Sequence, residues 1–291
     1  MNKGSFIQRL ADWYRSLPIQ PFRGVARSLY QRYRKSMMNR TVTTTVNGVR
    51  FELDLREHID SCLYYGTYEN ETREALVGLC KPGMTVLDIG SNLGCHTFYM
   101  AKAVQPGGCV YAFEPATVAF GKLSKHVSMN PDLPVKANRL ALADEAKQNV
   151  QTTVYCSWPV DSNFERIPGQ PMDRARAMED SIDMMPLDDF VESNDIKQID
   201  LIKMDVDGHE LPVLTGGRKT FQTHRPMVLF EHCQSVQKAY GREIRDVIAF
   251  FTDLDYTFRH ENTGEALDAE ELSSTDNDET TSFNVIAVPP A

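Results

Sequence analysis

An acid and two glycines follow the first strongly apolar segment of the main domain. Residues 86–94 read VLDIGSNLG, so Asp88 stands just before Gly90 and Gly94. Glycines at the carboxyl end of a strand allow a tight turn and let a ligand approach the backbone. The spacing D-x-G-x-x-x-G departs from G-x-G-x-x-G, whose following helix receives a pyrophosphate. Asp88 would repel a phosphate but could hold the ammonium group of an amino acid; a purely structural turn is the alternative.

A second acid ends the next apolar segment. Val110–Phe113 is followed by Glu114 and Pro115, and Glu114 lies twenty residues after Gly94. An acidic residue at that distance can reach a ribose diol. A carboxylate that accepts both hydroxyl hydrogen bonds would fix an adenosine and exclude a 2′-phosphate. Alternatively, Glu114 caps the next helix.

More titratable groups follow two later apolar segments. Residues 203–210 read KMDVDGHE, and a further strand-like segment ends in Glu-His at 231–232. The carboxyl ends of neighbouring parallel strands face one crevice, so we expect convergence of Asp205, Asp207, His209, Glu231 and His232. His209 or a carboxylate could remove the proton of an attacking hydroxyl, or Asp205 and Glu231 could bind Mg²⁺.

A structural role is the alternative for part of this cluster. Asp207 and Glu210 have capping-box spacing, and Pro212 suits the first turn of a helix. One or two of the acids would then serve the helix start.

The elements that must position these groups alternate between short apolar strands and helical stretches. We predict seven strands: Thr85–Ile89, Val110–Phe113, Val135–Leu140, Asp200–Met204, Met227–Phe230, Tyr256–Arg259 and Phe283–Val288. This alternation predicts a doubly wound α/β domain with a mostly parallel sheet and crossover helices. Residues 150–155 form a predicted extra strand, and residues 157–186 an irregular insertion, which is typical of a functional segment.

Two segments precede this domain, which we assign to residues 67–291. Residues 41–46 and 49–55 flank Asn47-Gly48, a strong signal for a β-hairpin, so residues 41–66 hold a hairpin and a connection. Residues 1–40 place apolar side chains at helical spacing and carry nine basic residues against one acidic. This basic arm is predicted to contain an amphipathic helix that contacts an anionic membrane, or packs on its own domain or on a second subunit.

Composition narrows the function classes. The chain of 291 residues carries a net charge of −9 although its first 40 residues are basic, so the acidic body argues against a nucleic-acid partner. Six scattered cysteines suit reduced thiols, and no signal peptide or membrane-spanning segment is expected. The expected location is cytoplasmic, with peripheral contact at the inner face of a membrane through the arm.

The combined motifs resemble the FkbM-type S-adenosylmethionine-dependent methyltransferases. The resemblance covers about residues 66–233 and rests on D-x-G-x-N-x-G at 88–94, FEP at 113–115, ALAD at 141–144 and IDLIKMDVDGHE at 199–210. It implies the class I methyltransferase fold, a Rossmann-like sheet of seven strands with the last one antiparallel. The segment GTYE at 66–69 would close over the methionine end of the cofactor, and Leu142 would lie near the adenine. The full set of implied cofactor contacts is Tyr68, Glu69, Asp88, Gly90, Asn92, Gly94, Glu114, Pro115, Leu142 and Asp205.

Two positions depart from the family pattern. Asp207 stands where the family more often has Glu, and His209 where it has an aromatic or apolar residue. The resemblance implies O-methylation of a hydroxyl on a sugar, polysaccharide or polyketide-like acceptor. The catalytic candidates are Asp205, His209 and Glu231, chosen because they follow the two predicted strands whose ends face the crevice. The alternatives are a nicotinamide-dependent oxidoreductase and a non-catalytic S-adenosylmethionine-binding protein.

Overall fold

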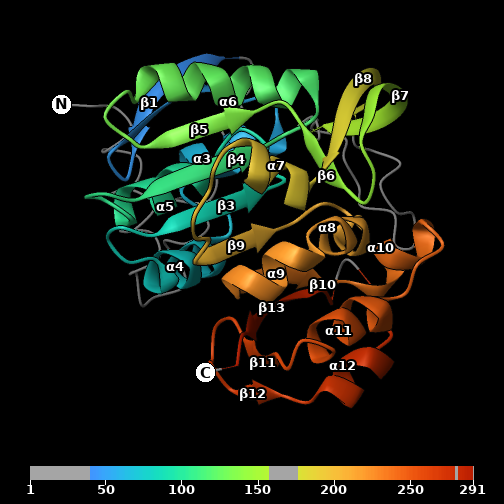
Figure 1. The fold of residues 1–291 in the computed structure, drawn as a ribbon. Helices are drawn as coiled ribbons and strands as arrows, with labels where there is room; N and C mark the ends of the chain where they lie inside the picture. Colours follow the sequence, from blue (N-terminus) through green and yellow to red (C-terminus); the bar gives the residue numbers. More distant parts are fainter. Residues whose placement is uncertain (1–39, 157–175, 279–280, 291) are drawn as a thin grey trace, which may run out of the picture. The chain divides into compact units, whose positions relative to one another are not determined.

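The computed structural model describes residues 40–156, 176–278 and 281–290 (Figure 1). The chain divides into two compact units, one of residues 1–70 with 155–178 and one of residues 71–154 with 179–291. The basic arm up to residue 39 and residues 157–175 of the insertion lie outside the described residues. Within the described ranges, no helix has both the length and the apolar character needed to cross a membrane.

The first unit is built on the predicted hairpin. β1 (Thr41–Val46) pairs antiparallel with β2 (Val49–Asp54), and the turn residues Asn47 and Gly48 have φ angles of 49° and 81°. Positive φ at both central residues is what a type I′ turn requires, so the hairpin is confirmed. Helix α3 (His58–Tyr65) follows, and its fully buried Asp60 accepts the Asp54 amide at 2.8 Å. Its eight residues lacked a clear sequence pattern, and this helix was not predicted.

The second unit contains the main sheet, whose strands run in the order β12-β11-β13-β10-β9-β3-β4-β5. β3, β4, β5, β9 and β10 are parallel, whereas β13 is antiparallel to both β10 and β11, as the family resemblance implied. All seven predicted strands are present, and the two-residue β12 is an addition at the edge. Their bounds are β3 Thr85–Ile89, β4 Cys109–Phe113, β5 Val135–Asn138, β9 Leu201–Met204, β10 Met227–His232, β11 Thr257–His260, β12 Ala266–Leu267 and β13 Phe283–Val288.

Side-chain alternation along these strands explains the helices on both faces of the sheet. Leu87 and Ile202 belong to a core cluster with α7, α8, α9 and α11, whereas Val86 and Leu201 belong to a second cluster with α4 and α5 (Figure 1). Both faces are therefore buried, as in a doubly wound fold. The helices are α4 Asn70–Leu79, α5 Thr97–Ala103, α6 Thr117–Met129, α7 Leu187–Ser193, α8 Glu210–Gly216, α9 Arg218–His224, α10 Gln234–Ala239, α11 Ile244–Thr252 and α12 Ala269–Ser274.

A small second sheet corrects the predicted insertion. β8 (Arg176–Pro186) lies between β6 (Ala141–Ala143) and β7 (Lys147–Cys156). Residues 176–186 are therefore a strand rather than irregular chain. The expected alternation of apolar and polar residues is absent there, because the segment is held by polar contacts to its neighbours.

The sheet topology predicts where a ligand would bind. From β3 the chain winds outward through β4 and β5, and it then returns to β9 on the opposite side of β3. The crossovers on the two sides of this boundary lead in opposite directions, and open α/β sheets bind their ligands at the carboxyl ends of the strands at such a point. The switch point lies between β3 and β9.

The ring cluster around Phe251 tests the core on one face of the sheet. Phe251 is fully buried, and its ring contacts those of Phe221, Phe230 and Phe258. We expect Phe251→Ala to lower the free energy of unfolding by about 3–5 kcal/mol, because it leaves a cavity among rings that cannot collapse together. Urea unfolding followed by circular dichroism measures this change. Val118→Ala, at an exposed position of α6, is the control; equal losses in both variants would contradict the assignment of Phe251 to the core.

Candidate active site

Strand register places four residues in one row at the carboxyl edge of the sheet. Ile89 pairs with Phe113 on β4 and with Met204 on β9, and Met204 pairs with Phe230 on β10. The next residues along these four strands are Glu114, Gly90, Asp205 and Glu231. They lie side by side across the switch point, in the order β4, β3, β9, β10. The two loops predicted from sequence to carry a cofactor and a catalytic group therefore meet here.

A second row lies two residues deeper, on the same face of the sheet. Its members, Ala112, Asp88, Lys203 and Leu229, are consecutive register partners. Asp88 and Lys203 are the charged pair within it, with 0% and 3% exposure. The Lys203 ammonium lies 3.5 Å from Asp88 Oδ1 and 3.2 Å from Asp205 Oδ2, and it donates to the Gly90 carbonyl at 2.8 Å.

The loop after β3 contacts the loop after β9 at Gly90, and this contact requires a glycine. A Cβ atom at Gly90 would lie 1.8 Å from the carbonyl oxygen of Asp205, and the φ angle of 78° is one that side chains rarely adopt. The sequence suggested that glycine here admits a ligand. The structure adds a different reason, which is that the backbone after β9 occupies the space of the missing side chain.

Glu114 connects the loop after β3 to the start of α6. Its Oε2 accepts the Asn92 amide and its Oε1 accepts the Ala116 amide, each at 2.9 Å. Burial raises the pKa of Glu114 to about 7, although these two amides and the Lys203 charge oppose the shift. The helix-capping role considered from sequence is thus present. Each oxygen retains a lone pair, so the carboxylate can still accept hydroxyl donors.

Asp88 has a different partner from the one expected. Its Oδ2 accepts the Thr97 hydroxyl at 2.5 Å, and the ammonium beside its other oxygen belongs to Lys203. Because the carboxylate is fully buried, we place Asp88 beneath the loop rather than against an amino acid ligand.

Burial and neighbouring acids raise the pKa values of Glu231 and Asp207. Burial and then the Asp205 charge raise the pKa of Glu231 to about 8, while a hydrogen bond with Ser282 opposes the shift. Asp207 reaches the surface, but the protein around it limits solvation. This effect and the Asp205 and Glu210 charges raise the pKa of Asp207 to about 7. The ends of β9 and β10 therefore combine a half-exposed Asp205 with two acids, Asp207 and Glu231, that titrate near neutral pH.

Glu210 has a structural role. It is buried, accepts the Val206 amide at 3.4 Å through Oε1 and bonds the Gln237 side chain through Oε2. α8 begins at Glu210, its N-cap is His209 without a side-chain cap, and Pro212 lies in its first turn. The capping box with Asp207 was therefore wrong, whereas the position of Pro212 was predicted correctly.

His209 lies on the loop after β9, beside an aromatic and a cationic side chain. Its ring meets that of Tyr240 edge-on at 4.4 Å, and Nδ1 lies 3.2 Å from the Val206 carbonyl. Burial and the positive charge of Arg242 lower the pKa of His209, so the imidazole is neutral at pH 7. A neutral imidazole can accept a proton.

His232 does not join the site. Its Nε2 donates to the Leu272 carbonyl at 2.8 Å, and its ring stacks on Phe283 at 4.9 Å. Asn277 binds both Nδ1 and the carbonyl of His232. The expectation of convergence was wrong for this residue, because successive side chains of a strand point to opposite faces and Glu231 takes the face of the site.

The remaining predicted cofactor residues have varied positions. Gly94 packs against Phe98 and Leu123, and Leu142 is buried in the core. Asn92, with φ of 49°, donates its amide to Glu114. Tyr68 and Glu69 belong to the first unit, and their cofactor contacts stay a prediction.

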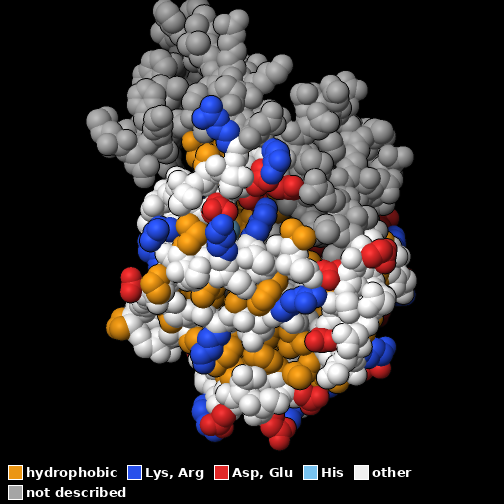
Figure 2. Space-filling view, turned by 90° about the horizontal axis from the view of Figure 1, so that it is seen from above, with side chains coloured by type: hydrophobic (Ala, Val, Ile, Leu, Met, Phe, Trp, Pro, Cys, Tyr) orange, Lys and Arg blue, Asp and Glu red, His pale blue; other side chains and the backbone are white. Residues whose placement is uncertain are grey.

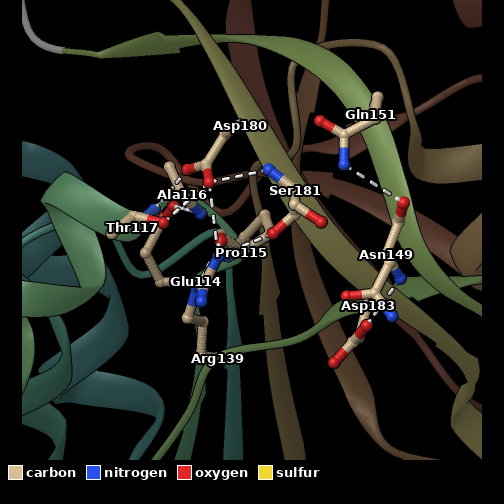
Figure 3. A network of polar contacts seen from close by, with 10 residues as sticks. All are labelled: Glu114, Pro115, Ala116, Thr117, Arg139, Asn149, Gln151, Asp180, Ser181 and Asp183. Carbon is tan, nitrogen blue, oxygen red and sulfur yellow. Dashed lines mark hydrogen bonds and ion pairs between the residues drawn. The ribbon is translucent and has the colours of Figure 1, made fainter.

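A polar network ties β8 to the turn that carries Glu114 (Figure 3). Asp180 accepts the Thr117 amide at 2.6 Å and the Thr117 hydroxyl at 2.7 Å. Arg139 donates to the Ser181 carbonyl at 2.6 Å and to that of Pro115 at 3.4 Å, and lies 3.3 Å from Asp180. The small sheet and the start of α6 are thereby joined beside Glu114.

The sequence also suggested a metal site at Asp205 and Glu231. In the described parts of the chain, no group of three or more His, Cys, Asp or Glu side chains is arranged to hold a metal ion. The nearest cation to Asp205 that the structure shows is the Lys203 ammonium.

Sequence reasoning missed Lys203, Asp180 and Arg139. Lys203 lies in the predicted strand 200–204 and was given no role. A lone Lys in an apolar strand was the available signal, but its partner Asp88 is found only from the pairing of β3 with β9. Asp180 and Arg139 lie in segments without periodicity, and nothing in the sequence singles them out.

Comparison with known proteins assigns the family. Residues 88–258, more than half of the chain, match the model of the methyltransferase FkbM domain. Methyltransferase 1 of Beauveria bassiana (strain ARSEF 2860) is 29% identical over 144 residues, which are 45% of this chain and 57% of that protein. The 31-O-demethyl-FK506 methyltransferase FkbM of Streptomyces tacrolimicus is 27% identical over 159 residues, 47% of this chain and 60% of that protein.

The chain thus spans about three fifths of the length of these curated relatives. A crystal structure of the methyltransferase FkbM from Methylobacillus flagellatus KT aligns with a TM-score of 0.44 and 16% identity, over 80% of this chain and 56% of that one. The family model includes the Gly90 loop, Glu114 and the ends of β9 and β10. On this match, the chain belongs to the FkbM methyltransferase family.

Proposed function

We propose that this protein is an S-adenosylmethionine-dependent O-methyltransferase acting on a hydroxyl of a sugar, polysaccharide or polyketide-like molecule. The observation that carries the proposal is the row Glu114, Gly90, Asp205, Glu231, because it joins a ribose-binding acid to groups able to accept a proton. Family membership supports methyl transfer. The name of the Streptomyces relative, which acts on FK506 demethylated at an oxygen, supports an oxygen acceptor.

The cofactor half of the row fits an adenosine. Glu114 is held by two backbone amides in one orientation, and its remaining lone pairs match the two hydroxyl donors of a ribose. The loop from Gly90 to Gly94 would place its backbone against the rest of the cofactor. When bound, S-adenosylmethionine supplies a methyl group activated by a positively charged sulfur.

The acceptor half of the row supplies a base. An alcohol is a weak nucleophile until its proton is removed, and a general base works best with a pKa near the operating pH. Glu231 meets this condition, since burial beside Asp205 raises its pKa to about 8. Asp205, anchored by Lys203, and neutral His209 are the other candidates for orienting the hydroxyl or accepting its proton.

Other partners stay predictions. On the face shown in Figure 2, the described Lys and Arg side chains lie among uncharged, hydrophobic and acidic ones. The expectation that nucleic acid is not a partner rests on the net charge of −9. Membrane contact or self-association through residues 1–40, and the cytoplasmic location, await experiment.

Glu114→Gln tests the cofactor half. The carboxamide offers one acceptor oxygen where the carboxylate offers two, so we expect S-adenosylmethionine to bind about tenfold or more weakly, the value of a charged hydrogen bond. Isothermal titration calorimetry measures the affinity. Glu192→Gln, exposed on α7, is the matched control. Unchanged affinity in a folded Glu114→Gln protein would remove Glu114 from the cofactor site.

The pH dependence of binding tests the same carboxylate. The folded, ligand-free protein keeps the Glu114 proton up to its raised pKa of about 7, so binding that needs the anion weakens as pH falls through 7. Between pH 8 and pH 6 we expect a loss of about tenfold in affinity, because about one molecule in ten remains ionised at pH 6. Glu114→Gln should lack this dependence. A wild-type affinity that is flat over this range would contradict the assignment.

Turnover tests the acceptor half, with a panel of glycans and hydroxylated natural products as acceptors. We expect kcat to rise with pH up to about 8, since Glu231 accepts a proton only when ionised. Glu231→Gln should lose this rise and about 10²–10⁴-fold in kcat, with cofactor affinity nearly unchanged. Asp205→Asn and His209→Gln are measured beside it. Wild-type turnover in all three variants would show that the base lies elsewhere.

A further inference from the structure

Two charged residues interrupt the otherwise apolar centre of the sheet. β3 reads TVLDI and β9 reads LIKM, so each of these adjacent parallel strands contains one charge. Asp88 and Lys203 are direct register partners, and both point to the face covered by α5, where Thr97 binds Asp88. Burying a charge costs several kcal/mol unless it is paired and hydrogen-bonded. Because Asp88 and Lys203 are register partners, each compensates the buried charge of the other, and we infer that this pairing has a specific role.

The partners of the Lys203 ammonium include oxygens on three different segments. It donates to the Gly90 carbonyl at 2.8 Å, and lies 3.2 Å from Asp205 Oδ2 and 3.5 Å from Asp88 Oδ1. Gly90 begins the loop after β3, and Asp205 begins the loop after β9. One cation thus holds the backbone of one loop and the side chain of the other.

The close approach of the two loops requires such a cation. Gly90 is packed on the Asp205 carbonyl, which brings two carbonyl groups and the Asp88 and Asp205 carboxylates to one place. Without a positive charge these oxygens would repel one another in surroundings of low polarity. The Lys203 ammonium supplies that charge from the second row, two residues deeper in the sheet. It therefore takes no position in the row of Glu114, Gly90, Asp205 and Glu231.

We propose that Lys203 is a positioning residue that fixes the Gly90 loop and Asp205 as one rigid unit, and that this arrangement prepares the site for ligand binding. The part that concerns ligand binding rests on the proposed function. The structural part does not, since it concerns contacts present without any ligand. Lys203 lies in the second row, two residues deeper than Gly90 and Asp205, and acts on the site through its contacts with those two residues.

The charge of Lys203 acts beyond its direct contacts. It lowers the pKa of Glu114 and of Asp207, against the burial that raises both. A role in shape alone would leave the titration of Glu114 unchanged when the charge is removed. This difference separates a positioning charge from a mere packing residue.

The test begins with the ligand-free protein and Lys203→Met, which keeps the length of the side chain and removes its charge. We expect a clear loss of stability in urea, and a Glu114 carboxyl that titrates at higher pH than in the wild type by carbon-13 NMR. Adding Asp88→Asn should restore part of the lost stability, because it removes the uncompensated buried carboxylate. Lys102→Met, at an exposed position of α5, is the matched control. A Lys203→Met protein with wild-type stability and Glu114 titration would overturn the proposal, as would an Asp88→Asn addition that destabilises it further.

Cofactor affinity is the second measurement, made on the stable Asp88→Asn, Lys203→Met double variant. We expect about a tenfold weaker affinity for S-adenosylmethionine at pH 7, and a binding curve against pH that lies at higher pH than that of the wild type. Wild-type affinity with an unshifted curve would overturn the ligand-binding part. If the wild type itself fails to bind S-adenosylmethionine, the proposed function fails, and the ligand-free measurements still decide the role of Lys203.

Discussion

The buried ion pair between Asp88 and Lys203 is the constraint on which the site depends. It is one of the four register pairs between β3 and β9, the parallel strands between which the winding of the sheet reverses. A shift of either strand by one residue would turn its charge to the opposite face and separate the pair. Since Gly90 and Asp205 stand two residues further along these strands, the pair also sets which residues meet at the crevice. The register of β3 and β9, the pairing of the buried charges and the geometry of the site therefore depend on one another.

The proposed cofactor half of the site lies on the β4 side of the Asp88–Lys203 pair, and the proposed acceptor half lies on the β10 side. On the β4 side, Glu114 is fixed by two backbone amides and by a helix start that Asp180 and Arg139 tie to β8. On the β10 side, Glu231 is half-buried among acids that raise its pKa. Repulsion between these acids lowers the free energy of unfolding at pH 8. Proteins commonly show such a loss of stability at functional sites. Substitutions near the end of β10 that change which acceptor binds can therefore leave the position of Glu114 unchanged.

Sequence reasoning identified the hairpin, the seven strands and the residues of the row, because periodicity, turn residues and the glycine loop are local signals. It failed for residues whose position depends on strand register or on the face of the sheet to which a side chain points. Glu231 and His232 were assigned to one crevice although neighbours on a strand point to opposite faces, and only Glu231 reaches the site. The contact of Asp88 with Lys203, 115 positions away in the chain, is found only by pairing β3 with β9, and the contact of Asp88 with a cofactor stays a prediction. Residues 176–186 look irregular because polar contacts, rather than an apolar face, hold β8 in place.

The position of β13 has a consequence for how the chain is made. β13 follows β11 and β12 in sequence, yet it lies between β10 and β11 in the sheet and pairs with both. During synthesis, β10 and β11 emerge first and have no bond to each other that could close the sheet. β10, with Val228 and Phe230, then presents an unpaired, apolar edge of the kind that joins strands of other chains. Until β13 has been made, this edge of β10 therefore stays open to pairing with strands of other chains.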